Sequence, residues 1–436
     1  MESIWQKETE KPNFNSLDGD IKTDVLIIGG GITGILCAYA LEKAGVDYLL
    51  AEAKTICDGV TKNTTAKVTF HHGAIFDKMI KMYGVEKSKL YIKAHTEAIE
   101  QLRQMSKEFP CDFEEVTSYV YSLCDKEKIQ KEVSALCKLG CRAKFVKDPD
   151  LPFPTAGAVE VEGQAQFNPL KFIYALSKDL KIYENTEVTE LKPKYAATKN
   201  GKIYANKIIV ATHFPFLNKH GLYFVKMYQH RSYVLALKNA PHVRGIYIDE
   251  NEKGLSFRSY DDILLLGGGA HRTGKNGGGW AELRKFAAKY YPDAKEVCHF
   301  ATQDCKTLDN IAYIGQYSAN TPNFFVATGF NKWGMTSATV ASNILCDLVT
   351  GRKNEYSSVF SPSRSIFHKQ LLTNACESVL GLITPVTPRC SHLGCALKYN
   401  KQEHSWDCAC HGSRFTDDGR VIDNPATENI NIGKRQ

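Results

Sequence analysis

Four residues near the C-terminal end of the sequence have the types and spacing that bind an iron–sulfur cluster. Cys390 and His392 form a Cys-x-His motif, and Cys408 and His411 form a Cys-x-x-His motif after 15 intervening residues. Two thiolates can bind one iron of a [2Fe–2S] cluster while two imidazoles bind the other, which raises its potential above that of all-cysteine clusters. Structural zinc is the alternative. Zinc sites usually pair their cysteines as Cys-x-x-Cys, so the alternating order favours the cluster.

The stretches around these ligands, SHLGC and CACHGSRF, resemble one large class of Rieske proteins. The resemblance implies a disulfide bond between Cys395 and Cys410 that ties the two cluster loops together. It also implies that Ser413 donates a hydrogen bond to a cluster sulfur. Phe415 stands where high-potential members have a tyrosine whose hydroxyl bonds a ligand sulfur. Because such bonds tune the cluster, we expect a lower reduction potential here.

A second group of residues, near the N-terminus, has the pattern of a dinucleotide site. Gly29, Gly31 and Gly34 form a G-x-G-x-x-G motif directly after the apolar run 24–28, and Glu52 follows 23 positions after the first glycine. The glycines allow a tight turn, close approach to a pyrophosphate and close helix packing, while the acid can bind a ribose. The following helix offers its N-terminus to the phosphate. The pattern predicts a bound dinucleotide; the alternative is a glycine-rich turn without a ligand.

Two observations favour FAD over NAD. The motif lies near the N-terminus, and the next recognisable return to its sheet comes about 130 residues later. No second glycine motif is present to hold a nicotinamide, because the run that begins at Gly267 has Arg272 where the third glycine belongs.

The sequence here resembles the glycine/D-amino-acid oxidase family of flavoproteins. Three stretches carry the resemblance: IIGGGITGILCAYAL, the segment from Asp58 to Lys67, and ATGFNKWGM at 327–335. The family implies that FAD lies between a discontinuous FAD-binding domain and a sheet-based substrate domain. Some relatives attach flavin covalently through a histidine just after the second strand. Asn63 stands at the nearest matching position, so we expect non-covalent FAD.

The resemblance and the glycine motif together assign residues to FAD. Four residues of the segment 61–66 would lie along the flavin, and Val188 would contact the adenine. Met335 would approach the pyrimidine end, where the N-terminus of the helix opened by Gly334 could stabilise negative charge on reduced flavin. The expected FAD-binding residues are Gly29, Gly31, Ile32, Thr33, Gly34, Glu52, Ala53, Thr61, Thr64, Thr65, Ala66, Val188, Ala211, Thr212, Gly329, Gly334, Met335 and Thr336.

Apolar periodicity predicts the elements that position these residues. A buried strand at 24–28, a helix at 32–44 and a strand at 48–51 form a β-α-β unit. Further helices are expected around 89–109 and 126–138 and at 336–349, and further strands within 182–210 and at 232–237, 263–266 and 324–329.

We therefore expect an α/β protein with a Rossmann-like FAD-binding domain, an inserted antiparallel-sheet substrate domain and a small all-β Rieske lobe. With only 49 residues, the lobe lacks the usual base sheet, so it should pack on the connector or on the FAD domain. The expected boundaries are 1–351 for the oxidoreductase region (FAD-binding parts at about 20–75, 160–215 and 305–351, substrate-domain parts at about 76–159 and 216–304), 352–387 for a connector with one short helix, and 388–436 for the lobe.

Composition limits the class of protein. The net charge of +7 comes from 55 basic and 48 acidic residues spread through all 436 positions, so no basic stripe predicts a nucleic-acid partner. The N-terminus lacks a basic segment followed by an apolar one, and no stretch approaches 18 uninterrupted apolar residues. We expect a soluble cytoplasmic protein without a membrane span. Ten of the 14 cysteines are scattered and are expected to be thiols.

The combination resembles bacterial FAD-dependent oxidoreductases with a C-terminal Rieske domain, a resemblance that covers nearly the whole chain but supplies no substrate. FAD exchanges two electrons as hydride while the cluster passes one at a time. We expect a small molecule, such as an amine or an amino-acid-like compound, to be oxidised, with electrons relayed to a redox partner protein or a small acceptor. The alternative is an electron-transfer or redox-sensing protein without its own substrate. Candidate catalytic residues are His71, His72, Arg231, Tyr233, His271, Arg272, Lys332 and Trp333, with Arg231 the best carboxylate clamp.

Overall fold

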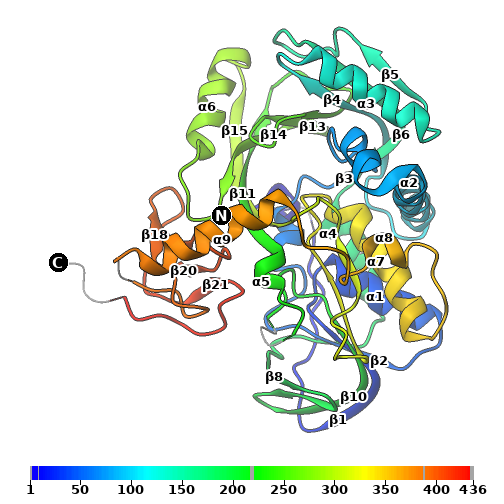
Figure 1. Cartoon of the computed structure of the whole chain (residues 1–436), viewed down its shortest axis with the longest axis vertical. Helices are drawn as coiled ribbons and strands as arrows, with labels where there is room; N and C mark the ends of the chain where they lie inside the picture. The colour runs from blue at the N-terminus through cyan, green and yellow to red at the C-terminus, as the bar shows by residue number, and fades with distance from the viewer. Residues whose placement is uncertain (1, 8, 217–219, 386–387, 433–436) are drawn as a thin grey trace.

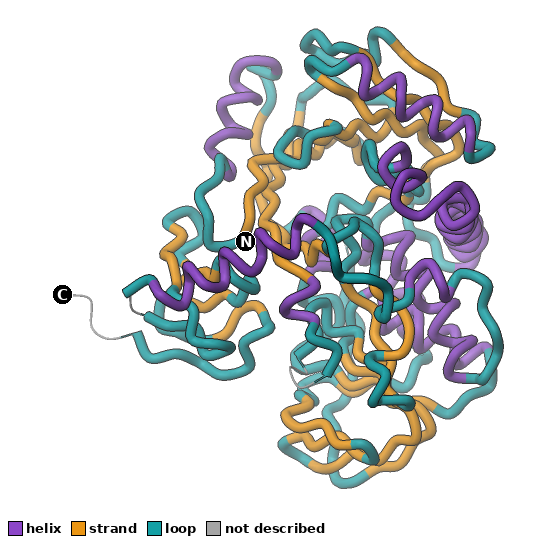
Figure 2. Tube along the Cα trace, in the orientation of Figure 1, coloured by secondary structure: helices purple, strands orange, loops and turns teal. Residues whose placement is uncertain are grey.

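A computed structural model describes residues 2–7, 9–216, 220–385 and 388–432, and within them the strands form three sheets (Figures 1 and 2). Two large sheets and their helices make up most of the molecule. The third sheet is small, is formed by the C-terminal residues, and lies at one side of the molecule. This division confirms the expected fold class.

The first sheet is mainly parallel and carries the dinucleotide motif at the end of its central strand. Its strands are β1 (Ile21–Ile28), β2 (Tyr48–Ala51), β7 (Ile182–Tyr183), β8 (Val188–Lys192), β9 (Tyr195–Thr198), β10 (Gly201–Val210), β16 (Tyr313–Gln316) and β17 (Phe324–Thr328). The order is β16-β17-β10-β1-β2-β7, with β9 beside β10 and β8 beside β9. Val25 to Ile28 are buried, as expected for a continuous apolar run in a covered parallel strand.

Two helices pack against each other beside this sheet. Helix α1 (Ile32–Lys43) follows the glycine motif, and α7 (Gly334–Val349) follows β17. Small buried residues such as Ala38 and Ala341 allow the two helices to approach closely. The short helix η2 (Val60–Asn63) and helix α4 (Pro169–Ser177) lie nearby, and η1 (Ile4–Lys7) contacts α4.

The second sheet is almost entirely antiparallel. Its strands are β3 (Lys67–Val68), β4 (Glu114–Ser122), β5 (Ala143–Val146), β6 (Gly157–Gln166), β11 (Met227–Lys238), β12 (Gly245–Asp249), β13 (Ser256–Tyr260), β14 (Ile263–Arg272) and β15 (Lys295–Thr307). The order is β15-β11-β14-β13-β12-β4-β6-β3, with β5 beside β6, and only β12 and β4 pair in parallel. Helices α2 (Phe76–Glu108), α3 (Lys126–Lys138) and α6 (Gly279–Tyr290) accompany it. The long strands β11 and β15 end at the FAD domain and so connect the two large units.

The third sheet carries the cluster motif. Its antiparallel strands are β18 (Leu397–Asn400), β19 (Ser405–Cys408), β20 (Arg414–Thr416) and β21 (Val421–Asp423). Helix α9 (Lys369–Ile383) lies along this sheet, close to α5 (Tyr223–Lys226) (Figure 1). We call β18–β21 and their loops, residues 388–432, the cluster lobe.

Most predicted elements are confirmed, and α3 has the predicted bounds because the Asp125 side chain caps its first turn by accepting from Lys128 N. The helix expected around 89–109 is the second half of α2, which is kinked at Gly84, where φ is 79°. The segment expected to hold one short helix holds two, α8 (Ser357–Phe360) and the 15-residue α9. In the described part of the chain, no helix combines the length and apolar character needed to cross a bilayer.

Candidate functional site

The glycine motif has no room for side chains. A Cβ on Gly34 would lie 1.9 Å from Gly29 O, and Gly29 itself has a φ of 108° that favours glycine. Glu52 Oε2 accepts a hydrogen bond from Gly30 N at 2.6 Å, and burial raises the pKa of its carboxyl group. Thr61 Oγ1 accepts from Ile32 N at 3.1 Å. The turn is therefore built to bring backbone close to a ligand at the start of α1.

A cavity of about 1920 Å³ opens from this turn, which is ample for a dinucleotide and a small substrate. Its walls come from both large sheets and from the cluster lobe. Of the expected FAD residues, Gly29, Gly31, Ile32, Thr33, Glu52, Ala53, Thr61, Thr64, Thr65, Val188, Ala211, Thr212, Gly329, Gly334 and Met335 line it. Asn63 lines it too and offers no nucleophile for a covalent link. The residues present therefore fit FAD.

Three expected FAD residues lie behind the cavity wall. Gly34 packs on Gly29 O, Ala66 is fully buried, and Thr336 Oγ1 donates to Thr69 O at 3.0 Å. These residues support the wall and do not line the cavity.

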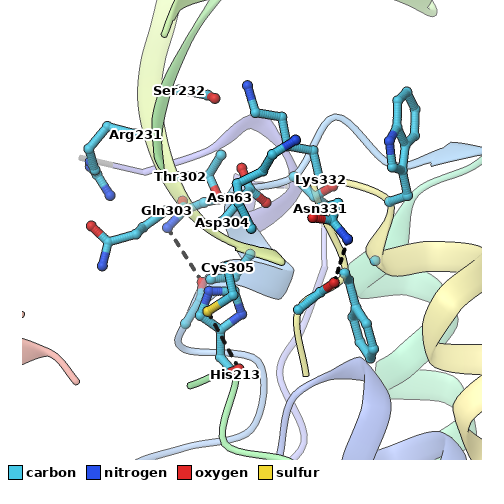
Figure 3. Close-up of a pocket in the computed structure, with 18 of the residues that line it drawn as sticks. Asn63, His213, Arg231, Ser232, Thr302, Gln303, Asp304, Cys305, Asn331 and Lys332 are labelled. Atoms are coloured by element: carbon cyan, nitrogen blue, oxygen red, sulfur yellow. Dashed lines mark hydrogen bonds between the residues drawn. The ribbon is translucent and has the colours of Figure 1, made fainter. Parts of the chain in front are cut away.

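Strands β11 and β15 form a wall of the flavin cavity, and the cluster lobe packs on them. Neighbouring residues of a strand face opposite sides of its sheet. The paired residues Arg231 and Gln303 face the lobe. Their neighbours Ser232, Thr302 and Asp304 face the other way. Figure 3 shows Arg231 and Gln303 on one side of the ribbon and Asp304 on the other. The Oγ atoms of Ser232 and Thr302 have no hydrogen-bond partner within the described residues. Both residues line the cavity, although these two atoms are themselves buried.

Lysine and aspartate side chains give this part of the cavity its charge. Lys332 has a left-handed backbone, with a φ of 80°, and burial lowers the pKa of its ammonium group although Asp304 acts in the opposite direction. Burial likewise raises the pKa of Asp304, opposed by Lys332. Lys67 donates to Thr65 Oγ1 at 2.9 Å, and burial, helped by the nearby Arg258, lowers its pKa to about 7. A proton can therefore be exchanged near neutral pH in this wall.

His72 is a fully bonded buried histidine that supports Trp333. Its Nδ1 lies 2.6 Å from Tyr91 Oη, and its Nε2 lies 2.7 Å from Thr69 O. Its ring stacks on Trp333 with 4.8 Å between centroids. Burial holds the pKa of His72 well below its usual value, so the ring is neutral. Both residues line the cavity, as expected, whereas the neighbouring His71 is buried outside it.

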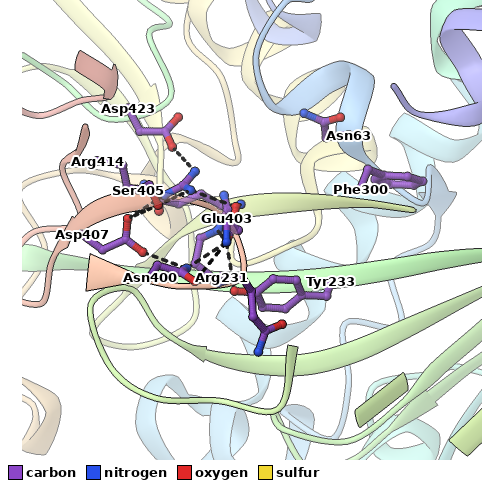
Figure 4. A network of polar contacts seen from close by, with 12 residues as sticks. Asn63, Arg231, Tyr233, Phe300, Asn400, Glu403, Ser405, Asp407, Arg414 and Asp423 are labelled. Atoms are coloured by element: carbon purple, nitrogen blue, oxygen red, sulfur yellow. Dashed lines mark hydrogen bonds and ion pairs between the residues drawn. The ribbon is translucent and has the colours of Figure 1, made fainter. Parts of the chain in front are cut away.

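Arg231, the residue expected to clamp a substrate carboxylate, holds a carboxylate of the chain itself. Its guanidinium makes a two-point ion pair with Glu403 of the cluster lobe, with 3.0 Å between Nε and Oε1 (Figure 4). Tyr233 donates to the same carboxylate at 2.9 Å, and Arg414 donates to it at 2.8 Å. Burial alone would raise the pKa of Glu403, but the two arginines outweigh it and lower the pKa to about 2.

His271 and Arg272 lie outside the cavity lining. Arg272 donates to the backbone carbonyls of Ala409 at 2.8 Å and Cys410 at 3.0 Å, and so anchors the loop that holds two of the predicted cluster ligands. His271 Nε2 lies 3.0 Å from the Tyr233 hydroxyl. Lobe docking therefore occupies three of the side chains that the sequence proposed for substrate binding, those of Arg231, Tyr233 and Arg272.

The cluster residues converge in the lobe. The Sγ atoms of Cys395, Cys408 and Cys410 lie within 4.8 Å of one another. The rings of His392 and His411 are 4.9 Å apart, and among the described residues His411 Nδ1 has no hydrogen-bond partner although it is buried. Burial lowers the pKa of His392 to about 4 and that of His411 to about 3, so both rings are neutral, as ligation requires.

The surroundings of these ligands agree with a cluster site. The Cys408 thiol beside Cys390 and burial raise the pKa of Cys390, while the Ser413 hydroxyl acts in the opposite direction. Phe415 is fully buried in the lobe core. Cys395 and Cys410 are thiols here, and their disulfide stays a prediction. A thiol pair and a neutral imidazole pair in one small lobe fit a [2Fe–2S] cluster.

Sequence reasoning missed four residues that the structure brings to the site. Asp304 and Gln303 lie on β15, which the sequence pattern did not identify as a strand, and Gln229 lies just before the predicted strand at 232–237. Glu403 lies in a polar turn of the lobe. Nothing in their local sequence distinguishes them from ordinary surface polar residues, so only the fold could identify them.

Comparison with known proteins agrees with this geometry. The FAD dependent oxidoreductase family, DAO, matches residues 24–348, and the Rieske [2Fe-2S] domain matches residues 369–433. YhfW of Bacillus subtilis, named as a Rieske 2Fe-2S iron-sulfur protein, is 34% identical over 490 residues, covering 98% of this chain and 96% of that protein.

Solved structures show the same fold. L-proline dehydrogenase from P. horikoshii superposes with a TM-score of 0.67 at 16% identity, covering 80% of this chain and 98% of that one. Glycine oxidase from Geobacillus kaustophilus gives 0.65 at 18% identity, covering 79% and 99%. The chain therefore belongs to the DAO family of FAD-dependent oxidoreductases, with a C-terminal Rieske domain that binds a [2Fe–2S] cluster.

Proposed function

We propose that this enzyme oxidises a small amine-like or amino-acid-like molecule at FAD and passes the electrons singly through the cluster to a redox partner protein or a small acceptor. When bound, FAD accepts a hydride, and the cluster carries one electron at a time. Two proteins of the same fold, glycine oxidase and L-proline dehydrogenase, are named for amino-acid substrates, which supports this class of substrate.

The observation that carries the proposal is the position of the cluster lobe. The lobe docks on β11 and β15, the strands that form a wall of the flavin cavity, and residues such as Asp423 and Asn424 of the lobe line the same cavity. Asn424 Nδ2 also donates to Phe214 O, just after β10 in the FAD domain, at 2.8 Å. A cluster held this close to the flavin site suits direct electron exchange within one chain.

The cavity wall supplies groups for binding and proton transfer. We assign substrate binding to Lys332 and Asp304, which can pair with the two charged ends of an amino acid, because Arg231 is already held by Glu403. Lys67, with its pKa near neutrality, can take a proton from a substrate amine. Trp333, stacked on His72, can pack against a ligand beside the flavin.

Anaerobic reduction tests the proposal. The holoenzyme is mixed without oxygen with each member of a panel of amines, amino acids and hydroxy acids, and both cofactors are followed by absorbance. The expected result is that one compound bleaches the flavin and that the cluster is then reduced. If no compound bleaches the flavin but a protein donor does, the enzyme has no small-molecule substrate, and the alternative of an electron-transfer or redox-sensing protein is correct.

We also propose a cytoplasmic location. Cys124, Cys137 and Cys376 are exposed thiols, which a reducing compartment preserves.

A further inference from the structure

Two buried glutamines stand between the flavin cavity and the cluster. Gln229 on β11 is 1% exposed and Gln303 on β15 is 2% exposed, and Gln303 Nε2 donates to Gln229 Oε1 at 2.7 Å. Thr273 Oγ1 donates to Gln303 Oε1 at 2.9 Å and so fixes the orientation of its amide. Gln303 also lines the cavity. The side-chain amides of Gln303 and Gln229 are therefore hydrogen-bonded to each other, and Gln303 is the one at the cavity.

The same amides end on the loop that carries a cluster ligand. Gln229 Nε2 donates to His411 O at 3.0 Å, and Gln303 Nε2 donates to Gly412 O at 2.8 Å. The loop lies directly on Gln229, since a Cβ on Gly412 would be 2.4 Å from Gln229 Cβ. Each glutamine is thus one hydrogen bond away from the backbone of the His411 loop.

The imidazole side of the cluster site faces into the molecule. The ring of Phe224, on α5, makes edge contacts with His392 at 6.0 Å and with His411 at 5.7 Å between centroids. Together with the glutamine contacts, this places the two predicted histidine ligands beside α5 and places the His411 loop against β11. Electron tunnelling weakens steeply with distance and passes more readily through bonds than through gaps, so the bonded route is favoured.

We propose that Gln303 and Gln229 form the bridge by which electrons pass between the flavin and the histidine side of the cluster. The inference rests on the proposed function. With both cofactors bound, one electron from reduced flavin would reduce one ferric iron of the cluster to ferrous iron, and a one-electron acceptor would reoxidise the cluster before the second electron follows. No atom crosses the bridge, and the proton that balances each electron stays on the flavin side. The glutamines are positioning residues that act through the His411 loop.

The test is Gln303→Met in the full-length holoenzyme, which keeps the length of the side chain and removes its hydrogen bonds. The flavin is photoreduced by a light flash with EDTA as donor, so no substrate is needed. We expect the rate of cluster reduction to fall at least about tenfold, in the range found when groups that orient metal ligands are removed. The reduction potential and the electron paramagnetic resonance g-values of the cluster should also shift, because the His411 loop loses a donor.

Gln164→Met is the matched control. Gln164, on β6 of the second sheet, is 1% exposed and accepts hydrogen bonds from Thr69 Oγ1 and Phe70 N, away from the lobe. It should leave the transfer rate, the potential and the g-values unchanged. If Gln303→Met loses a cofactor, Gln303→Glu, which keeps the shape, is measured in its place under the same criteria.

The outcomes separate this inference from the proposed function. Unchanged rate, potential and g-values in a variant that holds both cofactors would overturn the bridge. If photoreduced flavin never reduces the cluster in the natural protein, the proposed function itself fails, whatever the variants do.

Discussion

The ion pair of Arg231 and Glu403 places two charges in an almost dry interface. Their side chains are each 5% exposed, and Arg414 and Tyr233 bond the same carboxylate. A buried ion pair adds little net stability compared with apolar packing, but the loss of one partner leaves the other charge uncompensated. The pair therefore sets where the lobe docks more than how stable the fold is.

Glu403→Gln should consequently destabilise the docked lobe by about 3–5 kcal/mol. Chemical denaturation, followed by cluster absorbance, measures the loss. Glu162→Gln is the control, because it breaks only the exposed pair of Glu162 with Lys144 and should leave the stability nearly unchanged. Equal effects of the two substitutions would contradict a special role for Glu403.

The same residue predicts how docking depends on pH. The pKa of Glu403 is lowered from 4.5 to about 2 in the folded protein, so its contribution is complete above about 4.5 and is lost as the pH falls toward 2. Stability measured across that range should decline in the natural protein. In Glu403→Gln this part of the decline should be absent, and its persistence would assign the acid sensitivity to other carboxylates.

Lys67 predicts the pH dependence of catalysis. Its lowered pKa of about 7 means that the neutral, proton-accepting form increases as the pH rises through 7. Flavin reduction by the substrate should rise over the same range, and Lys67→Met should lose this rise and slow the step about 100-fold. Rapid mixing at several pH values measures it. Lys89→Met, an exposed residue paired with Glu86, serves as the control, and an unchanged pH profile in Lys67→Met would refute the role.

At the scale of elements, the close contact of the loop 408–413 with β11 depends on a glycine. Gly412 has a φ of 90°, and a Cβ there would overlap Gln229, whereas Gly394 in the other cluster loop has a φ of 76° and open space around it. The two glycines share a left-handed backbone but differ in their surroundings. Alanine substitutions at the two positions therefore distinguish the cost of backbone strain from the cost of overlap with a neighbouring side chain.

Gly394→Ala should therefore cost about 1–2 kcal/mol from backbone strain alone. Gly412→Ala should cost about 1–3 kcal/mol more, because the overlap also lifts the loop from β11. Thermal unfolding, followed by the visible absorbance of the cluster, compares the two. Equal melting temperatures would show that the contact with Gln229 is unimportant.

At the scale of the whole molecule, the lobe depends on its neighbours. A Cβ on Gly381 of α9 would lie 2.4 Å from Cys410 Sγ, and Arg389 donates to the carbonyls of Gly381 and Leu382. The expectation that the lobe packs on the connector or the FAD domain agrees with these contacts. The extensive docking on β11 and β14 of the second sheet was not expected. It depends on Arg231 and Arg272, which the sequence analysis assigned to catalysis and substrate binding.

A fragment of residues 388–436 should therefore fail to hold its cluster, and one of residues 365–436, which adds α9, should hold it better. Iron content and absorbance after purification measure both fragments. A cluster held as firmly by the shorter fragment as by the whole chain would show that the lobe is an independent domain.

The sequence alone determined the cofactors and the fold class, and it predicted the ligand set. These depend on short spacings, such as Gly29 to Gly34 and Cys408 to His411, whose stereochemistry is set mainly within one turn or loop. Only the tertiary structure decided that Arg231 binds Glu403, 172 residues away, and that Gln303 reaches Gly412, 109 residues away. Such contacts arise from the packing of a whole lobe on a sheet. The side chains that form them look, in sequence, like any other polar residues on a strand or turn.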